Sequence, residues 1–121
     1  MACYLQIPTH NDDRGSLSVI EKILPFEIKR VYYMYDVSQT RGGHAHIKTT
    51  QAFVCLGGSC EIVTQTKQCR QSFLLDSPQK CLVLEPHEWH TIENLSPQAF
   101  LLVLASEYYD PSDYIVEIPN D

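Results

Sequence analysis

The chain has 121 residues, about the length of one domain, and 44% of them are hydrophobic and 20% charged. This is the composition of a compact globular protein, which excludes a disordered, collagen-like or coiled-coil chain. Nine Lys and Arg against fifteen Asp and Glu give a formal net charge of −6, which argues against general binding to nucleic acid or to anionic lipid.

Neither export nor membrane insertion is indicated. Residues 1–15 lack the basic and apolar segments of a secretory signal. No run approaches the roughly 18 to 20 apolar residues of a membrane helix, and the longest, residues 99–105, has the length of a buried strand. The five cysteines are odd in number and lack CxxC spacing, which predicts reduced thiols rather than a disulfide framework or a zinc ribbon. We therefore expect a cytoplasmic protein.

Short runs of β-branched and aromatic residues alternate with turn residues along the whole chain. They predict ten strands, in chain order at residues 16–21, 29–36, 43–48, 51–57, 59–65, 68–74, 80–84, 90–94, 99–106 and 114–118. Only residues 110–114, with a proline near their start, suggest a helical turn. The pattern predicts one all-β domain over residues 1–121, either a sandwich or a small antiparallel barrel. Polar residues at inward strand positions are then the candidates for chemistry.

The sequence RGGHAH at residues 41–46 is the most informative local motif. On a strand, His44 and His46 point to one face with Cα atoms about 6 to 7 Å apart, so two imidazoles can address one ligand. The two glycines before them allow a tight turn and close approach to a bound molecule. A second cluster, EPHEWHTIEN at residues 85–94, contains His90.

These two clusters resemble the two motifs of the cupin family. His44, His46 and Gln51 match the spacing of the first motif, and His90 with Asn94 matches the end of the second. In that family the motifs face each other across an antiparallel β-barrel, or jelly roll, and three His and one Glu bind a metal. Gln51 replaces the acidic ligand here. Because three imidazoles can still hold zinc, iron or nickel, a metal-dependent cupin enzyme remains an alternative.

A closer resemblance covers residues 12–115. The strings DDRGSLSVIE, IKRVYYMYDV, RGGHAH, EWH and VLASEYYDPSDYI are similar in order and spacing to the nucleotide-sugar 3,4-ketoisomerases, the WxcM-like branch of the cupins. Those enzymes move the carbonyl of dTDP-4-oxo-6-deoxy-glucose from C4 to C3, in making amino sugars for bacterial surface polysaccharides such as the O-antigen of lipopolysaccharide. The resemblance implies this isomerase activity on a dTDP-linked small molecule, with no cofactor and no metal.

The resemblance also implies three catalytic residues. The reaction removes a proton from C3, passes through an enediolate and delivers a proton to C4, and a neutral imidazole can carry that proton near neutral pH. We expect His44 to be the base at C3 and His46 its partner at the neighbouring oxygen or carbon. Tyr32 matches a tyrosine near the sugar and is expected to hydrogen-bond the oxygen that becomes anionic. Strand alternation places Tyr33 and Tyr35 on the opposite face.

Four further residues are expected to bind the substrate. Arg41 can clamp the diphosphate with two parallel hydrogen bonds, and Gln51 is expected at the site because it belongs to the first motif. Arg14 and His90 occupy two positions whose pairing resembles the branch that leaves the new C4 hydroxyl in the galacto configuration. The expected product is therefore dTDP-3-oxo-6-deoxy-galactose.

A non-catalytic cupin that merely binds a nucleotide sugar is the second alternative to the ketoisomerase.

The resemblance also implies a partner. Members of the resembled family pair as homodimers that exchange N-terminal strands. We expect the same here, because a short barrel with open edges benefits from a partner.

Overall fold

The structure, a computed structural model, describes all residues from 1 to 121 and consists of strands, turns and loops. Its twelve strands are β1 Cys3–Gln6, β2 Thr9–Asp12, β3 Gly15–Ser18, β4 Arg30–Tyr35, β5 Arg41–His46, β6 Gln51–Gly57, β7 Cys60–Gln65, β8 Arg70–Leu75, β9 Lys80–Leu84, β10 His90–Glu93, β11 Phe100–Ala105 and β12 Tyr114–Ile115. Each of the ten predicted strands overlaps one of these, whereas β1 and β2 were missed. Of the expected helical turn at residues 110–114, residues 110–113 form a single turn, closed by a hydrogen bond from Asp113 N–H to the Asp110 carbonyl, and Tyr114 begins β12.

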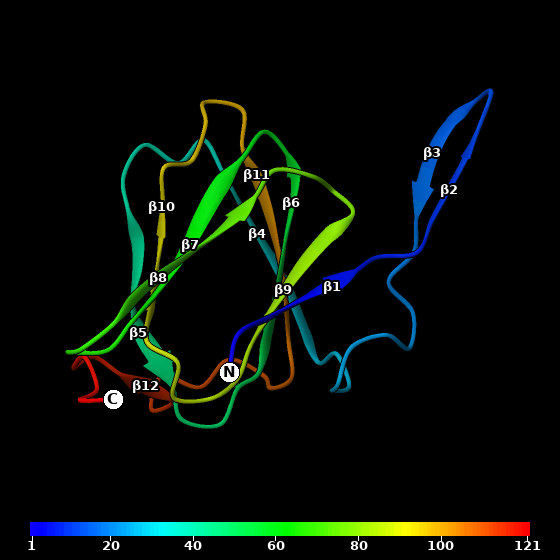
Figure 1. Cartoon of the computed structure of the whole chain (residues 1–121). Helices are drawn as coiled ribbons and strands as arrows, with labels where there is room; N and C mark the ends of the chain where they lie inside the picture. Colours follow the sequence, from blue (N-terminus) through cyan, green and yellow to red (C-terminus); the bar gives the residue numbers. More distant parts are fainter.

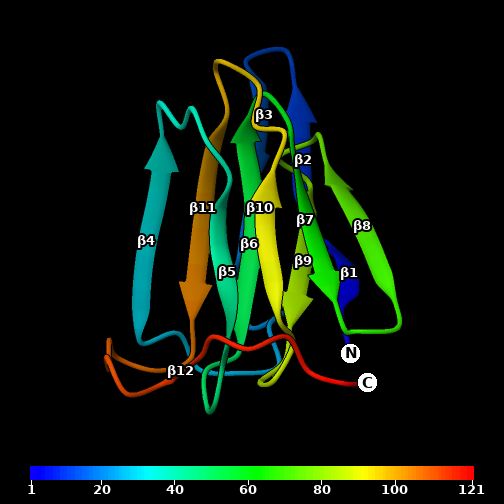
Figure 2. The same ribbon diagram turned by 90° about the vertical axis from the view of Figure 1, so that its left-hand side faces the viewer.

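Two five-stranded antiparallel sheets face each other as a jelly-roll barrel (Figure 1). The first sheet has the order β1-β9-β6-β11-β4, and the second has the order β12-β5-β10-β7-β8. Figure 2 shows the long strands of both sheets running side by side. The cupin-type all-β fold expected from the sequence is confirmed. The structure contains no helix of the length and apolarity that crossing a bilayer requires.

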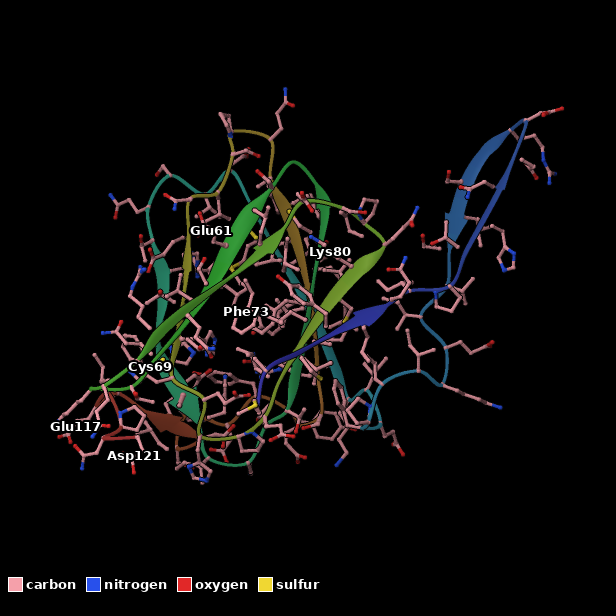
Figure 3. All side chains as sticks on the ribbon, in the orientation of Figure 1. Glu61, Cys69, Phe73, Lys80, Glu117 and Asp121 are labelled. Carbon is pink, nitrogen blue, oxygen red and sulfur yellow. The ribbon has the colours of Figure 1, made fainter.

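Strand alternation decides which side chains face the interior. Along β4, half-buried and exposed residues alternate, so Tyr32 points inward and Tyr33 and Tyr35 point outward, as predicted. The main core lies between the sheets and is built largely from β6, β7, β9 and β11. Figure 3 shows Phe73 of β8 directed toward this core, against which it packs. The side of the barrel next to β4 and β5 is left for polar groups.

The β2–β3 hairpin projects away from the barrel (Figure 1). It forms a separate two-stranded sheet, paired from Thr9 with Ser18 to Asp12 with Gly15. Nearly all of its residues are exposed. Because an isolated two-stranded hairpin is only marginally stable in water, this one requires a surface to pack against.

Candidate active site

A cavity of about 300 Å³ opens between the two sheets, where the edge strand β4 approaches β5. Its polar side chains come from β4, β5 and β10: Arg30, Tyr32, Arg41, His44 and His90. Its apolar and aromatic side chains come from β4, β6, β10 and the C-terminal segment: Met34, Phe53, Ile92, Tyr109 and Tyr114. A concave, mostly apolar site of this size with a few convergent polar groups is typical of small-molecule sites.

Three histidines meet at this cavity. The pairing of β5 with β10 sets His44 opposite His90, and their ring centroids are 5.4 Å apart. The ring of His46, two residues along β5, lies 5.2 Å from that of His44 and nearly perpendicular to it. His44 and His90 line the cavity, whereas His46 is only 4% exposed and is buried next to His44 and Tyr114.

Burial keeps these histidines neutral. It lowers the pKa of His90 to about 4, against a smaller opposing effect of the hydrogen bond with the Glu88 carbonyl. Burial also lowers the pKa of His44, with a smaller contribution from His46. For His46, burial outweighs the neighbouring Asp113 carboxylate, so its pKa is lowered too. Each imidazole is therefore unprotonated near neutral pH and keeps one ring nitrogen as a hydrogen-bond acceptor.

Tyr32 is held in place by Gln51. The Gln51 Nε2 donates a 2.6 Å hydrogen bond to the Tyr32 hydroxyl oxygen, which leaves the hydroxyl hydrogen free for a ligand. Burial raises the pKa of Tyr32 to about 12, so its phenol is a donor at neutral pH. Gln51 is 2% exposed and does not line the cavity. Gln51 was expected to bind the substrate, and in the structure its amide contacts Tyr32, which lines the cavity.

Two guanidinium groups lie at the cavity. Arg41, exposed at the start of β5, lines it as expected. The guanidinium carbon of Arg30 lies 5.3 Å from the ring centroid of Tyr32 and 5.7 Å from that of Tyr109. The Nε of Arg30 is buried and has no hydrogen-bond partner. In a chain of net charge −6, two arginines at one opening favour an anionic group there.

Arg14 does not reach the cavity of its own chain. It lies in the turn of the projecting β2–β3 hairpin, where its side chain is 90% exposed and pairs with Asp12 at 2.6 Å. His90, its expected partner in setting the product configuration, lines the cavity inside the barrel. The structure therefore does not bring Arg14 and His90 together within one chain.

The residues of the cupin metal motif do not fit a metal ion. No three His, Cys, Asp or Glu side chains are placed to share one. Gln51 is engaged with Tyr32, and Nδ1 of His46 lies 3.0 Å from the Asp113 carboxylate. Nδ1 of His90 lies 3.0 Å from the Glu88 carbonyl. The acidic cupin ligand is thus missing, and Gln51 in its place is hydrogen-bonded to Tyr32.

Two of the residues in contact with His46 were not identified by the sequence analysis. Tyr114 pairs with His46 across β12 and β5, and its ring centroid lies 4.8 Å from those of both His44 and His46. Asp113 contacts His46 from 67 positions away in the chain. The only signal for either was the string SEYYDPSDY, whose match to known proteins indicated no role.

Known proteins resemble this chain over most of its length. The family model described as FdtA, WxcM-like, C-terminal, matches residues 2–120. A TDP-4-oxo-6-deoxy-alpha-D-glucose-3,4-oxoisomerase of Aneurinibacillus thermoaerophilus is 45% identical over 113 residues, which cover 90% of this chain and 81% of the relative.

Two solved structures are similar over 96% of the chain. A 3,4-ketoisomerase from Helicobacter canadensis has a TM-score of 0.91 at 40% identity, with 90% of that chain covered. QdtA, a sugar 3,4-ketoisomerase from Thermoanaerobacterium thermosaccharolyticum in complex with TDP, has a TM-score of 0.91 at 38% identity, with 88% of that chain covered.

Proposed function

Since the chain belongs to the FdtA family of WxcM-like proteins, we propose that its cavity binds a TDP-4-oxo-6-deoxy sugar and moves the carbonyl from C4 to C3. The chain is a sugar-nucleotide 3,4-ketoisomerase of deoxysugar biosynthesis, as its relatives are. Two hydrogens move in this reaction, one from C3 to C4 and one from the oxygen on C3 to the oxygen on C4. His44, which lines the cavity, and His46, buried next to it, supply one imidazole for each transfer.

His44 carries the hydrogen that is bound to carbon. It lines the cavity, and burial lowers its pKa, so the neutral ring can take the proton from C3. The resulting imidazolium returns the proton to C4 of the enediolate. His46 and His90 beside it are neutral, so no neighbouring positive charge opposes the transfer.

Tyr32 stabilises the negative charge that develops on the C4 oxygen. The hydrogen bond from Gln51 occupies its hydroxyl oxygen and directs the hydroxyl hydrogen elsewhere, and the phenol stays protonated at neutral pH. A donor already oriented toward a forming oxyanion loses no energy to reorientation during the reaction.

His46 carries the hydrogen that is bound to oxygen. It accepts the hydrogen of the hydroxyl on C3 and returns it to the oxygen on C4, so the ring ends the cycle as it began. Its ring touches two cavity-lining rings, those of His44 and Tyr114.

Arg41 binds the diphosphate, and Arg30 lies close enough to assist. A planar guanidinium makes two parallel hydrogen bonds to phosphate oxygens, which a flexible lysine does not reproduce. The TDP complex of QdtA supports a thymidine diphosphate as the carrier.

A second copy of the chain completes the site. In a homodimer that exchanges N-terminal strands, the β2–β3 hairpin of each chain would pack on its partner and bring Arg14 to the partner's cavity. There Arg14 and His90 would set the face on which C4 is protonated and give the galacto product, dTDP-3-oxo-6-deoxy-galactose. The exposure of the hairpin supports this arrangement. The expected cytoplasmic location stays a prediction.

The observation that carries the proposed mechanism is the convergence of His44 and Tyr32 on one cavity from opposite sheets. The test is to incubate the protein with dTDP-4-oxo-6-deoxy-glucose, trap the product with an aminotransferase and identify it by NMR. We expect an amino group at C3 and an axial C4 hydroxyl. An amino group at C4 would contradict the isomerase, and an equatorial hydroxyl would contradict only the roles of Arg14 and His90.

A further inference from the structure

A buried carboxylate lies behind the cavity, just before β12. Asp113 is 4% exposed and accepts hydrogen bonds from four consecutive residues that end β5 and follow it. The donors are Nδ1 of His46 at 3.0 Å, the N–H groups of Ile47 at 3.1 Å and Lys48 at 2.8 Å, and the hydroxyl of Thr49. Because an ionised carboxylate accepts about four hydrogen bonds, the acceptor capacity of Asp113 is filled.

The ionisation of Asp113 determines which atom carries the hydrogen between Nδ1 of His46 and Oδ2 of Asp113. Burial alone would raise its pKa, but the hydrogen bonds from Thr49, Lys48 and His46 outweigh burial and hold the pKa below its ordinary value. An ionised carboxylate only accepts, so the hydrogen between the two side chains belongs to Nδ1 of His46. Because a neutral imidazole carries one ring hydrogen, Nε2 of His46 must bear a lone pair.

We propose that Asp113 is a positioning residue that fixes His46 as its Nδ1–H tautomer, so that Nε2 is free to accept the hydrogen of the sugar hydroxyl. This inference rests on the proposed role of His46 as the carrier of the oxygen-bound hydrogen. The Nε2–H tautomer of His46 would present an N–H to the sugar hydroxyl, which needs a hydrogen-bond acceptor there. Tyr114, the next residue, packs against the His44 and His46 rings, so one short segment fixes both the tautomer and the ring position.

The two carboxylate oxygens of Asp113 allow a merely structural role to be distinguished from its role in fixing the His46 tautomer. Its Oδ1 holds the backbone of Ile47 and Lys48, whereas its Oδ2 holds His46 and Thr49. In Asp113→Asn the Oδ1 contacts can persist, but an amide in place of Oδ2 donates to Nδ1 and favours the Nε2–H tautomer.

Two control variants test loss of packing and loss of charge. Thr49→Val removes one donor to the same oxygen and leaves the carboxylate. Asp110→Asn removes a carboxylate from the same segment. The Asp110 carboxylate is hydrogen-bonded to Ser112 and Lys48, and it does not line the cavity.

The experiment combines NMR and kinetics on the full chain. Two-bond ¹H–¹⁵N correlation of protein labelled at histidine distinguishes protonated from unprotonated ring nitrogens, and the signals of His46 are those missing from His46→Asn. We expect the Nδ1–H tautomer in the wild type, Thr49→Val and Asp110→Asn, and the Nε2–H tautomer in Asp113→Asn. We also expect kcat of Asp113→Asn to fall about 10²-fold with KM changed less than about threefold, and both controls to keep kcat within about threefold.

Three results would overturn the inference. The first is an Nε2–H tautomer in the wild type. The second is an Asp113→Asn protein in which either the tautomer or kcat is unchanged. The third is a loss of kcat in Thr49→Val as large as that in Asp113→Asn. The wild-type spectrum decides the tautomer even if Asp113→Asn does not fold. Because the spectrum needs no substrate, a failure of this inference is distinguishable from an absence of ketoisomerase activity.

Discussion

The three histidines at the cavity differ in what holds each ring. Nδ1 of His90 is bound to the Glu88 carbonyl, and that of His46 to the Asp113 carboxylate. His44, which lies between them and is half-buried, has only a backbone partner at Gly42. A base that serves two neighbouring carbons must shift between them, and His44 is the ring with the freedom to do so.

The hydroxyl of Tyr32 can be removed with little change in shape. We expect Tyr32→Phe to lower kcat by about 10²-fold, the effect of removing one preorganised donor to an oxyanion. The buried Gln51 amide would lose its acceptor, so the free energy of unfolding should fall by about 1 to 2 kcal/mol. Steady-state kinetics and denaturant unfolding measure the two effects. Tyr33→Phe, outward on the same strand, is the control, and an equal loss of kcat there would contradict the role of Tyr32.

Stability should depend on pH through the buried histidines. The pKa of His90 is about 4 in the folded protein against 6.5 as the ordinary value, so below pH 6.5 the unfolded chain binds a proton that the folded chain does not. The free energy of unfolding should therefore fall as the pH drops from about 6.5 to about 4, by about 3 kcal/mol from His90 alone. His44 and His46 should also lower the free energy of unfolding as the pH drops, because burial lowers their pKa values too.

Urea unfolding at a series of pH values tests this dependence. His90→Asn should be less stable than the wild type near neutral pH but should lose less stability on acidification. If the two proteins show the same loss between neutral and acidic pH, His90 is not held neutral by burial.

For single residues, the sequence predicted the direction of a side chain correctly where the spacing along one strand determines it. The two-residue spacing of His44 and His46 and the alternation around Tyr32 follow from strand geometry alone, and both agree with the structure. The contact of Gln51 with Tyr32 could not be predicted, because a motif gives the position of a side chain in the chain but not its hydrogen-bond partner. Asp113 was missed, because its contact with His46 depends on how β12 pairs with β5.

At the scale of elements, the pairing of β5 with β10 builds the site. The register changes between His90 and Thr91, so that His90 faces His44 and Thr91 faces Gly42. Gly42 has a φ of +86°, and a Cβ there would lie 3.0 Å from the His90 carbonyl oxygen and 3.2 Å from the Thr91 Cα. Only glycine allows the two backbones to approach so closely.

We therefore expect Gly42→Ala to push β5 away from β10. The strained φ and the backbone contact should cost roughly 1 to 3 kcal/mol of folding free energy, and kcat should fall because His44 moves relative to His90. Gly57→Ala is the matched control, since its Cβ would meet only a carbonyl oxygen at 3.6 Å. Thermal unfolding and kinetics of both variants provide the comparison, and a Gly42→Ala protein as stable and active as Gly57→Ala would contradict this account.

Regular elements were predictable where apolar and β-branched runs are flanked by turn residues. The short strands β1 and β2 were not, because neither has an apolar run of its own. β1 is recruited as an edge strand by pairing with β9, about 80 positions away, and β2 pairs only with β3 in the projecting hairpin. A pattern within one short segment carries no information about such a partner.

For the whole molecule, the central question is whether two chains share each active site. If Arg14 serves the partner's cavity, a mixed dimer of Arg14→Ala and His44→Asn has one site with both substitutions and one with neither. Co-expression of the two variants should then restore formation of the galacto product to about a quarter of the wild-type level, although neither variant alone forms it. No recovery in mixed dimers of confirmed composition would show that Arg14 does not act across the interface.

The most direct test of the mechanism follows hydrogen exchange at the sugar. In deuterated water with dTDP-4-oxo-6-deoxy-glucose, the wild type should introduce deuterium at C3 of recovered substrate or at C4 of the product. His44→Asn should abolish this exchange and leave the affinity for dTDP within about threefold, because the base is lost but the diphosphate site is intact. If folded His44→Asn exchanged deuterium as fast as the wild type, His44 would not be the base.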